Sequence, residues 1–378
     1  MSTTPFARST AVPGLALTGR YANYTNADTW YPTWAADGHL YSPWTDGALL
    51  PSGEYDPTGV AAGGYPCNSL DWDGRRAATG QARIVGDDPL HLRVENLTPR
   101  VEADPAPYGG RYPCGSLAHN GVWYYGTYGL ADTTGAALPQ WNVMGPCVGF
   151  RWSTDAGATW TETPRTPAAP LFAEDPSRAP VKLGAPHFVD FGQNMQHSPD
   201  GLAYLVAHGS TRPEAQNSWE KGDQVYLARV RPSIATINDP AAYEFFAGYG
   251  AGGAARWSAR LADLQPMLEW PGHLGIANLS YNPGLGRYLL FVTDARTNTH
   301  YDLLIMESET VSGPWRQAAH WERFGPAAYF VNAPTKFMSA DGRTFWLLYS
   351  ANWSEKETAG DPVGSAYSMS WHEVRVTV

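Results

Sequence analysis

Five segments of the chain repeat one pattern, and this repetition limits the fold more than any other feature of the sequence. In each segment an apolar or aromatic run is followed by a tight polar turn with glycine and then by a second aromatic run, as in TWYPTWAADGHLYSPWTDG at 29–47. The other four segments are 114–129, 186–210, 275–294 and 333–352. Four of the turns contain Asp-Gly or Asn-Gly, which supply the positive φ that short hairpin turns require. The sequence therefore predicts five β-hairpins.

Additional strands are expected outside these hairpins. Third strands are predicted at 80–86, 147–153, 223–230, 301–308 and 366–376, and weaker fourth strands at 159–164, 243–248 and 315–321. Four-stranded units that repeat around an axis are typical of β-propellers. We therefore predict an all-β fold, a single five-bladed β-propeller domain over residues 1–378, with four-stranded antiparallel blades and the hairpins innermost. The N-terminal stretch around Leu15 to Gly19 is expected to close the ring by pairing with the last blade.

The composition agrees with this fold and excludes several functions. The 39 Gly and 31 Pro would break a long helical bundle, and an aromatic content of 13% is too high for a disordered chain. A net charge of −10 argues against a nucleic-acid partner. No run of about 18 apolar residues and no apolar signal core are present, so we expect no membrane partner. The protein is expected to be cytoplasmic, or secreted if a signal peptide has been removed.

Two turns resemble motifs of known propeller families. Residues 153–160, STDAGATW, resemble the Asp-box of sialidase-type propellers, S-x-D-x-G-x-T-W, and fall between the third and fourth strands of the second blade, where that family places it. In an Asp-box the Asp side chain bonds backbone amides of the turn and the Trp packs between blades. Residues 307–315 look like the corresponding turn of five-bladed arabinanase-type and xylosidase-type glycoside hydrolases. These resemblances imply a carbohydrate-active propeller.

One departure from the arabinanase-type hydrolases concerns the general acid. The resemblance implies a glutamate on the inner strand of the third blade, but this chain has His187 and Asp190 there. The departure affects the expected mechanism more than the expected class of substrate.

Strand direction predicts which residues surround the mouth of the central channel. If the turns between first and second strands lie on one face of the ring, the starts of first strands and the ends of second strands lie on the other. The residues at these positions are Asp28, Trp30, Tyr31, Asp46, Arg111, Tyr112, Tyr128, His187, His208, His273, Asp294, Asn332 and Asn352. Such side chains suit a sugar, because its hydroxyls form hydrogen bonds and its C–H face stacks on aromatic rings. A carbohydrate substrate is therefore the expected partner.

Glycoside hydrolysis gives these residues roles, because it needs acidic groups on opposite sides of a pocket. The hypothesis places Asp28 and Asp46 on the side of the base or nucleophile, and His187 or Asp294 on the side of the acid. The predicted substrate-binding residues are Trp30, Tyr31, Arg111, Tyr128, His208, His273 and Asn332.

Two other functions remain open at this point. A lyase acting on a uronic acid would use a His or Tyr base, such as His187, His208 or Tyr128, with Arg111 neutralising the carboxylate. A non-catalytic sugar-binding propeller would use the same mouth without a reaction. No cofactor is expected, and the histidines lack the HxxxH spacing of a metal site, although the central channel near Asp190 leaves room for a structural ion.

Overall fold

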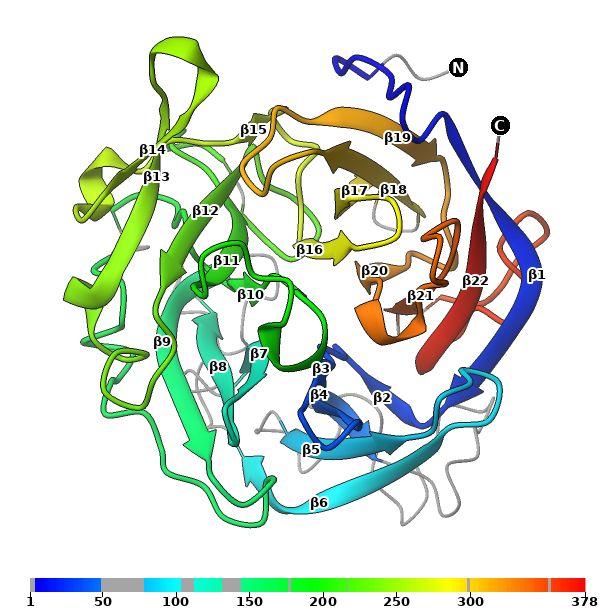
Figure 1. The fold of residues 1–378 in the computed structure, drawn as a ribbon, viewed down its shortest axis with the longest axis horizontal. Helices are drawn as coiled ribbons and strands as arrows, with labels where there is room; N and C mark the ends of the chain where they lie inside the picture. The colour runs from blue at the N-terminus through cyan, green and yellow to red at the C-terminus, as the bar shows by residue number, and fades with distance from the viewer. Residues whose placement is uncertain are drawn as a thin grey trace.

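Five antiparallel sheets surround a common axis in the computed structural model, which confirms the predicted five-bladed β-propeller (Figure 1). The structure describes residues 4–48, 78–102, 112–130, 144–175, 178–215, 217–297, 300–352 and 355–377. None of the helices in these ranges is long and apolar enough to cross a membrane.

The blades follow one another along the chain, and each is numbered by the order of its innermost strand. Blade I contains β2 (Asn26–Asp28), β3 (Thr33–Trp34), β4 (Leu40–Ala48), β5 (Ala78–Val85) and β6 (Arg93–Glu102). Blade II contains β7 (Tyr112–His119), β8 (Val122–Leu130) and β9 (Met144–Ser153). Blade III contains β10 (His187–Phe188), β11 (Ala203–Gly209), β12 (Gln224–Val230), β13 (Tyr243–Tyr249), β14 (Ala255–Ser258) and β15 (Leu268–Glu269).

The last two blades complete the ring. Blade IV contains β16 (Ala277–Asn282), β17 (Arg287–Thr297), β18 (His300–Ser308) and β19 (Arg316–Trp321). Blade V contains β20 (Tyr329–Asn332), β21 (Thr344–Ser350), β22 (Met369–Thr377) and β1 (Gly14–Tyr24). Short 3-10 helices are η3 (Gln193–Met195), η4 (Pro240–Ala242), η5 (Ala251–Gly253), η6 (Leu261–Asp263) and η7 (Thr335–Phe337).

The N-terminal strand closes the ring, as the sequence predicts. Strand β1 pairs antiparallel with β22, from Gly14 opposite Thr377 to Tyr24 opposite Met369. Blade V therefore combines three strands from the end of the chain with one from its beginning, and the two termini lie near each other in Figure 1. Both ends of the chain are thus held in one sheet, and closing the ring in this way protects the sheet edges.

The blades do not all have the four strands that the sequence predicts: blade I has five and blade III has six, and blades V and II differ as follows. In blade V the inner strand is Tyr329–Asn332, whereas the predicted strand after 333 contains η7. Pro334 has no N–H to give to a sheet, and the next amide, Thr335 N, donates to Asp190 Oδ2 at 2.7 Å instead. In blade II the predicted fourth strand at 159–164 contributes, among the described residues, a single bridge between Trp152 and Thr161.

The sheets pack face to face through aromatic and branched side chains, so the core lies between blades. One cluster contains Trp30, Trp44 and Trp371 and joins blade I to blade V. Trp30 is 1% exposed, and its Nε1 donates to Ala27 O at 2.9 Å. Trp30 was predicted to bind substrate, but its ring is enclosed by the interblade core and offers no face to a ligand.

The turns between first and second strands meet on one face of the ring, which we call the turn face. Lys336 Nζ donates to Gly38 O at 2.6 Å, Asn282 Nδ2 to Gly342 O at 2.9 Å, and Asn120 N to Asn194 Oδ1 at 2.8 Å. The opposite face, where β2, β7, β10, β16 and β20 begin, is called the mouth face.

Candidate active site

Asp28 ends the short strand β2 at the mouth face. Its side chain is 3% exposed, and the Tyr329 hydroxyl from blade V donates to its Oδ2. Residues with left-handed φ surround this pair: Thr25 at 75°, Thr29 at 57° and Phe330 at 57°. Positive φ is costly for β-branched and bulky residues, and such strain gathers at functional sites. Asp28 is therefore held in position by a strained backbone and by a partner 301 residues away.

Tyr31 lies near Asp28, whose charge helps to raise the pKa of the Tyr31 hydroxyl, and its ring packs against His187 from blade III. The rings of Tyr31 and His187 are 4.2 Å apart between centroids, and both line a cavity of about 30 Å³ on the axis, with Asn332. A cavity of this size holds about one water molecule. Strand β7 can approach β10 here because Gly115 has no Cβ; one would lie 2.6 Å from Pro186 O.

The two buried histidines of this region are neutral at physiological pH. His187 Nδ1 accepts a hydrogen bond from Gly115 N at 3.4 Å, and burial, with His208 nearby, lowers the pKa of His187 to about 3. His208 Nε2 lies 2.5 Å from Ser218 O, and burial lowers the pKa of His208 to about 4. General acid–base catalysis works best with a pKa near the operating pH, so these rings are poorly suited to that role.

His273 and Asp294 contact each other between blades III and IV. His273 Nδ1 lies 2.9 Å from Asp294 Oδ2, and the imidazole stacks on Trp270 with centroids 4.0 Å apart. Asp294 is fully buried, and burial raises its pKa, while His273 partly offsets this shift. The carboxylate also faces Asp302 and His320, so its contacts lie within blade IV and its border with blade III.

The remaining predicted residues are placed as follows. Tyr128 is buried, with its ring 5.8 Å from that of Tyr112. Asn332 Nδ2 donates to Trp30 O at 3.1 Å and to Phe330 O at 3.0 Å, so this amide ties blade V to blade I. Asp46 belongs to β4, but its side chain lies outside the described residues, as does the whole of Arg111.

The mouth face carries a further carboxylate, Glu220, which was not among the predicted site residues. Glu220 lies in the connection between β11 and β12, is half-buried, and accepts the Tyr301 hydroxyl on Oε1. Burial raises the pKa of Glu220, and the hydrogen bond from Tyr301 partly offsets this shift. The sequence signal for Glu220 is its place in the connection that follows a second strand, because such connections also lie at the mouth face.

A series of contacts through blades IV and V connects Glu220 to Asp28. Asn352 Nδ2 donates to the Tyr301 hydroxyl at 3.5 Å, just beyond the end of β21. Ser350, at the end of β21, pairs with Tyr329, whose hydroxyl holds Asp28. Two carboxylates of the mouth face, Asp28 from blade I and Glu220 from blade III, therefore each accept a hydrogen bond from a tyrosine of another blade. Tyr329 was missed because the inner strand of blade V begins four residues earlier than predicted.

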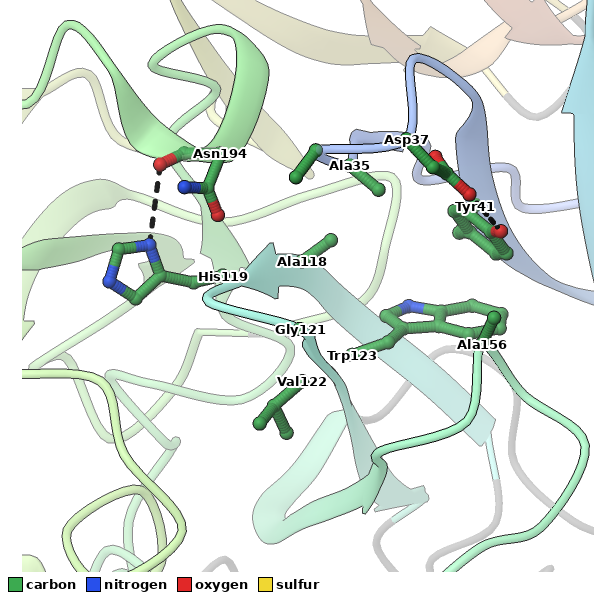
Figure 2. Close-up of a pocket in the computed structure, with 11 residues that line it drawn as sticks. Ala35, Asp37, Tyr41, Ala118, His119, Gly121, Val122, Trp123, Ala156 and Asn194 are labelled. Carbon is green, nitrogen blue, oxygen red and sulfur yellow. Dashed lines mark hydrogen bonds between the residues drawn. The ribbon is translucent and has the colours of Figure 1, made fainter.

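The turn face has a larger hollow of about 220 Å³, shown in Figure 2. Ala35, Ala118 and Trp123 form much of its wall. Its polar groups are already paired: Tyr41 donates to Asp37 at 2.6 Å, and His119 Nδ1 lies 3.3 Å from Asn194 O. Its lining includes a single carboxylate, Asp37, which the Tyr41 bond holds.

Among the comparisons with known proteins, only the comparison with solved structures found similar proteins. No protein-family model matches the chain, and no curated protein matches it. The chain is similar to the α-L-arabinofuranosidase PaAbf62A from Podospora anserina (TM-score 0.44, 9% identity, 94% of this chain and 92% of that one). It is also similar to a GH43_1 enzyme from Xanthomonas citri (TM-score 0.47, 12% identity, 93% of this chain and 89% of that one). A third similar structure is the GH32 β-fructofuranosidase BmSUC1 from Bombyx mori (TM-score 0.48, 12% identity, 94% of this chain and 62% of that one).

Proposed function

We propose that the protein is a glycoside hydrolase that binds its substrate at the mouth face, with Glu220 as general acid and Asp28 as base or nucleophile. The observation that supports this proposal is the pair of tyrosine-bound carboxylates, Asp28 with Tyr329 and Glu220 with Tyr301. They come from different blades and so can approach a glycosidic bond from two sides, as this chemistry requires.

Glu220 suits the acid because its environment favours the protonated form. Burial raises the pKa of its carboxyl group, so more of it carries a proton near neutral pH than in an exposed glutamate. The side chain is half-buried, which leaves it access to a bound sugar. In the reaction its proton passes to the glycosidic oxygen as the bond to the sugar carbon breaks.

Asp28 suits the other role because its carboxylate is fixed and receives a donated hydrogen bond. The Tyr329 hydroxyl stabilises the charged form, and the strained residues Thr25 and Thr29 hold the strand on both sides. The carboxylate then removes a proton from water that attacks the sugar carbon, or attacks that carbon itself.

The lyase hypothesis is less well supported, because one of its three proposed bases, Tyr128, is only 2% exposed and the other two are His187 and His208. Their pKa values of about 3 and about 4 lie far below the pH at which a base of this kind works best. A sugar-binding protein without activity is distinguished from the hydrolase by experiment.

The test compares the wild type with Glu220→Gln and Asp28→Asn on a panel of polysaccharides and aryl glycosides. A hydrolase produces reducing ends, whereas a lyase produces an unsaturated uronate that absorbs in the ultraviolet. Loss of a general acid matters less when the leaving group is already acidic. We therefore expect Glu220→Gln to retain a larger fraction of wild-type activity on nitrophenyl glycosides than on alkyl glycosides. Equal losses on both would contradict the role of Glu220, and no product with any substrate would contradict the hydrolase.

A further inference from the structure

A second group of polar side chains, separate from the proposed acid and base, lies inside blade IV at its border with blade III. It consists of Asp294 on β17, Asp302 on β18 and His320 on β19. Their carboxylate and imidazole donor atoms all lie within 4.8 Å of one another. Asp294 is 0% exposed, Asp302 is 1% exposed, and the His320 side chain is 4% exposed.

The two carboxylates of this group are neighbours by strand register. Asp294 stands directly opposite Asp302 in the antiparallel pair of β17 and β18. Like charges at directly opposed positions are unfavourable, and burying them together is more so unless a positive charge compensates. A divalent cation between the two would cancel both negative charges.

His320 supplies an independent sign that a ligand belongs there. Its Nε2 is buried and lies 3.1 Å from Asp302 Oδ2, yet it makes no hydrogen bond with any described residue. Buried polar atoms normally have a partner, so this nitrogen, directed at two carboxylates, is in the position of a metal ligand.

The neighbouring groups orient the carboxylates as in known metal sites. His273 Nδ1 lies 2.9 Å from Asp294 Oδ2, and Arg323 N donates to Asp302 Oδ1 at 2.9 Å. Such outer contacts hold ligands in position and tune their affinity for the metal. His273 stacks on Trp270 and its side chain is 36% exposed, so the group borders solvent on this side. An ion could enter from there and keep a water molecule in its remaining position.

We propose that Asp294, Asp302 and His320 form a binding site for a divalent transition metal of the zinc class. Two carboxylate oxygens and one imidazole nitrogen are ligands that Zn²⁺ accepts, whereas Ca²⁺ and Mg²⁺ prefer oxygen ligands alone. Bound metal joins β17, β18 and β19 at the end of the blade that faces the mouth. The proposal does not depend on the proposed hydrolase activity.

The test measures metal binding by the full-length chain, independently of activity. After removal of metals with a chelator, the protein is dialysed against Zn²⁺ and then against buffer, and bound zinc is measured by mass spectrometry. We expect about one Zn²⁺ per wild-type chain, and far less in Asp302→Asn and His320→Gln. His273→Ala, which removes an orienting contact, should weaken binding by roughly 10- to 100-fold.

A matched control variant and a direct determination of where the zinc ion binds complete the test. His91 forms an exposed ion pair with Asp88 at 2.9 Å, and His91→Gln should bind zinc as the wild type does. Because removal of a buried residue can unfold the protein, circular dichroism is recorded for each variant. Anomalous scattering from zinc-soaked wild-type crystals locates the ion without any substitution. The proposal is overturned if the wild type retains no zinc, if His320→Gln retains as much as the wild type, or if the anomalous peak lies elsewhere.

Discussion

The carboxylates of the turn face and those of the mouth face are held in different ways. On the turn face four aspartates accept a backbone N–H from two or four residues further along the chain. These pairs are Asp37 with His39, Asp155 with Thr159, Asp200 with Leu202 and Asp341 with Arg343. Two of these aspartates also accept the hydroxyl of a tyrosine four residues later, Tyr41 for Asp37 and Tyr204 for Asp200.

On the mouth face the partners come from distant parts of the chain. Asp28 is 301 residues from Tyr329, and Glu220 is 81 residues from Tyr301. The direction of the pKa shift also differs between Asp155 on the turn face and Glu220 on the mouth face. Hydrogen bonds from Thr159 and Ser153 lower the pKa of Asp155 to about 2, whereas burial raises the pKa of Glu220. Local bonds thus favour the charged form of Asp155, whereas the burial that follows from assembly of the ring favours the protonated form of Glu220.

The strongest test of this comparison replaces one aspartate on each face. Asp28 and Asp37 each accept a tyrosine hydroxyl, so Asp28→Asn and Asp37→Asn are matched changes. We expect Asp28→Asn to lower kcat by about a thousandfold, equivalent to about 4 kcal/mol in the barrier, because it removes the reacting charge. Asp37→Asn should leave kcat within a small factor of the wild type. Retention of more than about a tenth of wild-type kcat by Asp28→Asn would show that Asp28 is not catalytic.

The buried histidines predict how stability depends on pH. The pKa of His208 is about 4 in the folded protein, against about 6.5 when unfolded, so the unfolded state binds more protons. The free energy of unfolding should therefore fall as the pH falls from 6.5 towards 4, by on the order of 3 kcal/mol for this residue. Urea unfolding across this range measures the slope, and His208→Gln should reduce it. A slope unchanged in His208→Gln would exclude His208 as its source.

The alkaline limb of the pH–rate profile tests Glu220. A general acid must be protonated, so activity should fall as the pH rises through the raised pKa of Glu220. In Glu220→Gln the residual activity should lose this limb, because the amide does not titrate. Glu244, a half-buried glutamate paired with Arg229 in blade III, provides the control Glu244→Gln, which should keep the wild-type profile. An alkaline limb that persists in Glu220→Gln would assign it to another group.

The smallest effect on stability is expected from a substitution in the Asp-box turn. Asp155 is ionised above its pKa of about 2, and its contribution to stability is lost as the pH falls from about 4 through that value. Asp155→Asn should lower the Tm slightly at pH 7, and the difference from the wild type should disappear near pH 2. Activity per folded molecule should not change. A loss of kcat in this variant without a change in Tm would contradict a structural role.

The repeats predicted the architecture because hairpins depend on local residues. Gly38 and Gly121 have φ of 87° and 78°, as the turn sequences require, and the predicted pairing of the N-terminal strand is present. The Asp-box segment forms its turn through Ser153, Asp155 and Thr159, and the Trp160 ring packs 4.8 Å from Trp123. Each of these features is encoded within a few residues of sequence, apart from the pairing of the chain ends, which the apolar pattern still indicated.

The candidate site was predicted less completely, because strand ends do not reveal where side chains point. The faces of a propeller blade look towards neighbouring blades, and alternate residues of a strand face opposite sides. Val292, two residues before Asp294, belongs to the cluster shared with blades II and III, so Asp294 faces blade III with it and meets His273. Position along the strand had placed Asp294 at the channel, whereas the twist and packing of blade IV decided its partners.

By itself, then, the sequence determined the number of blades, the hairpin turns and the presence of Asp28 at the mouth face, since these follow from local periodicity and strand direction. Only the tertiary structure decided that Tyr329 meets Asp28, that Tyr301 meets Glu220, and that two aspartates of blade IV share a buried space. The physical reason is that burial and charge pairing depend on distances between residues tens to hundreds of positions apart, which closure of the ring establishes.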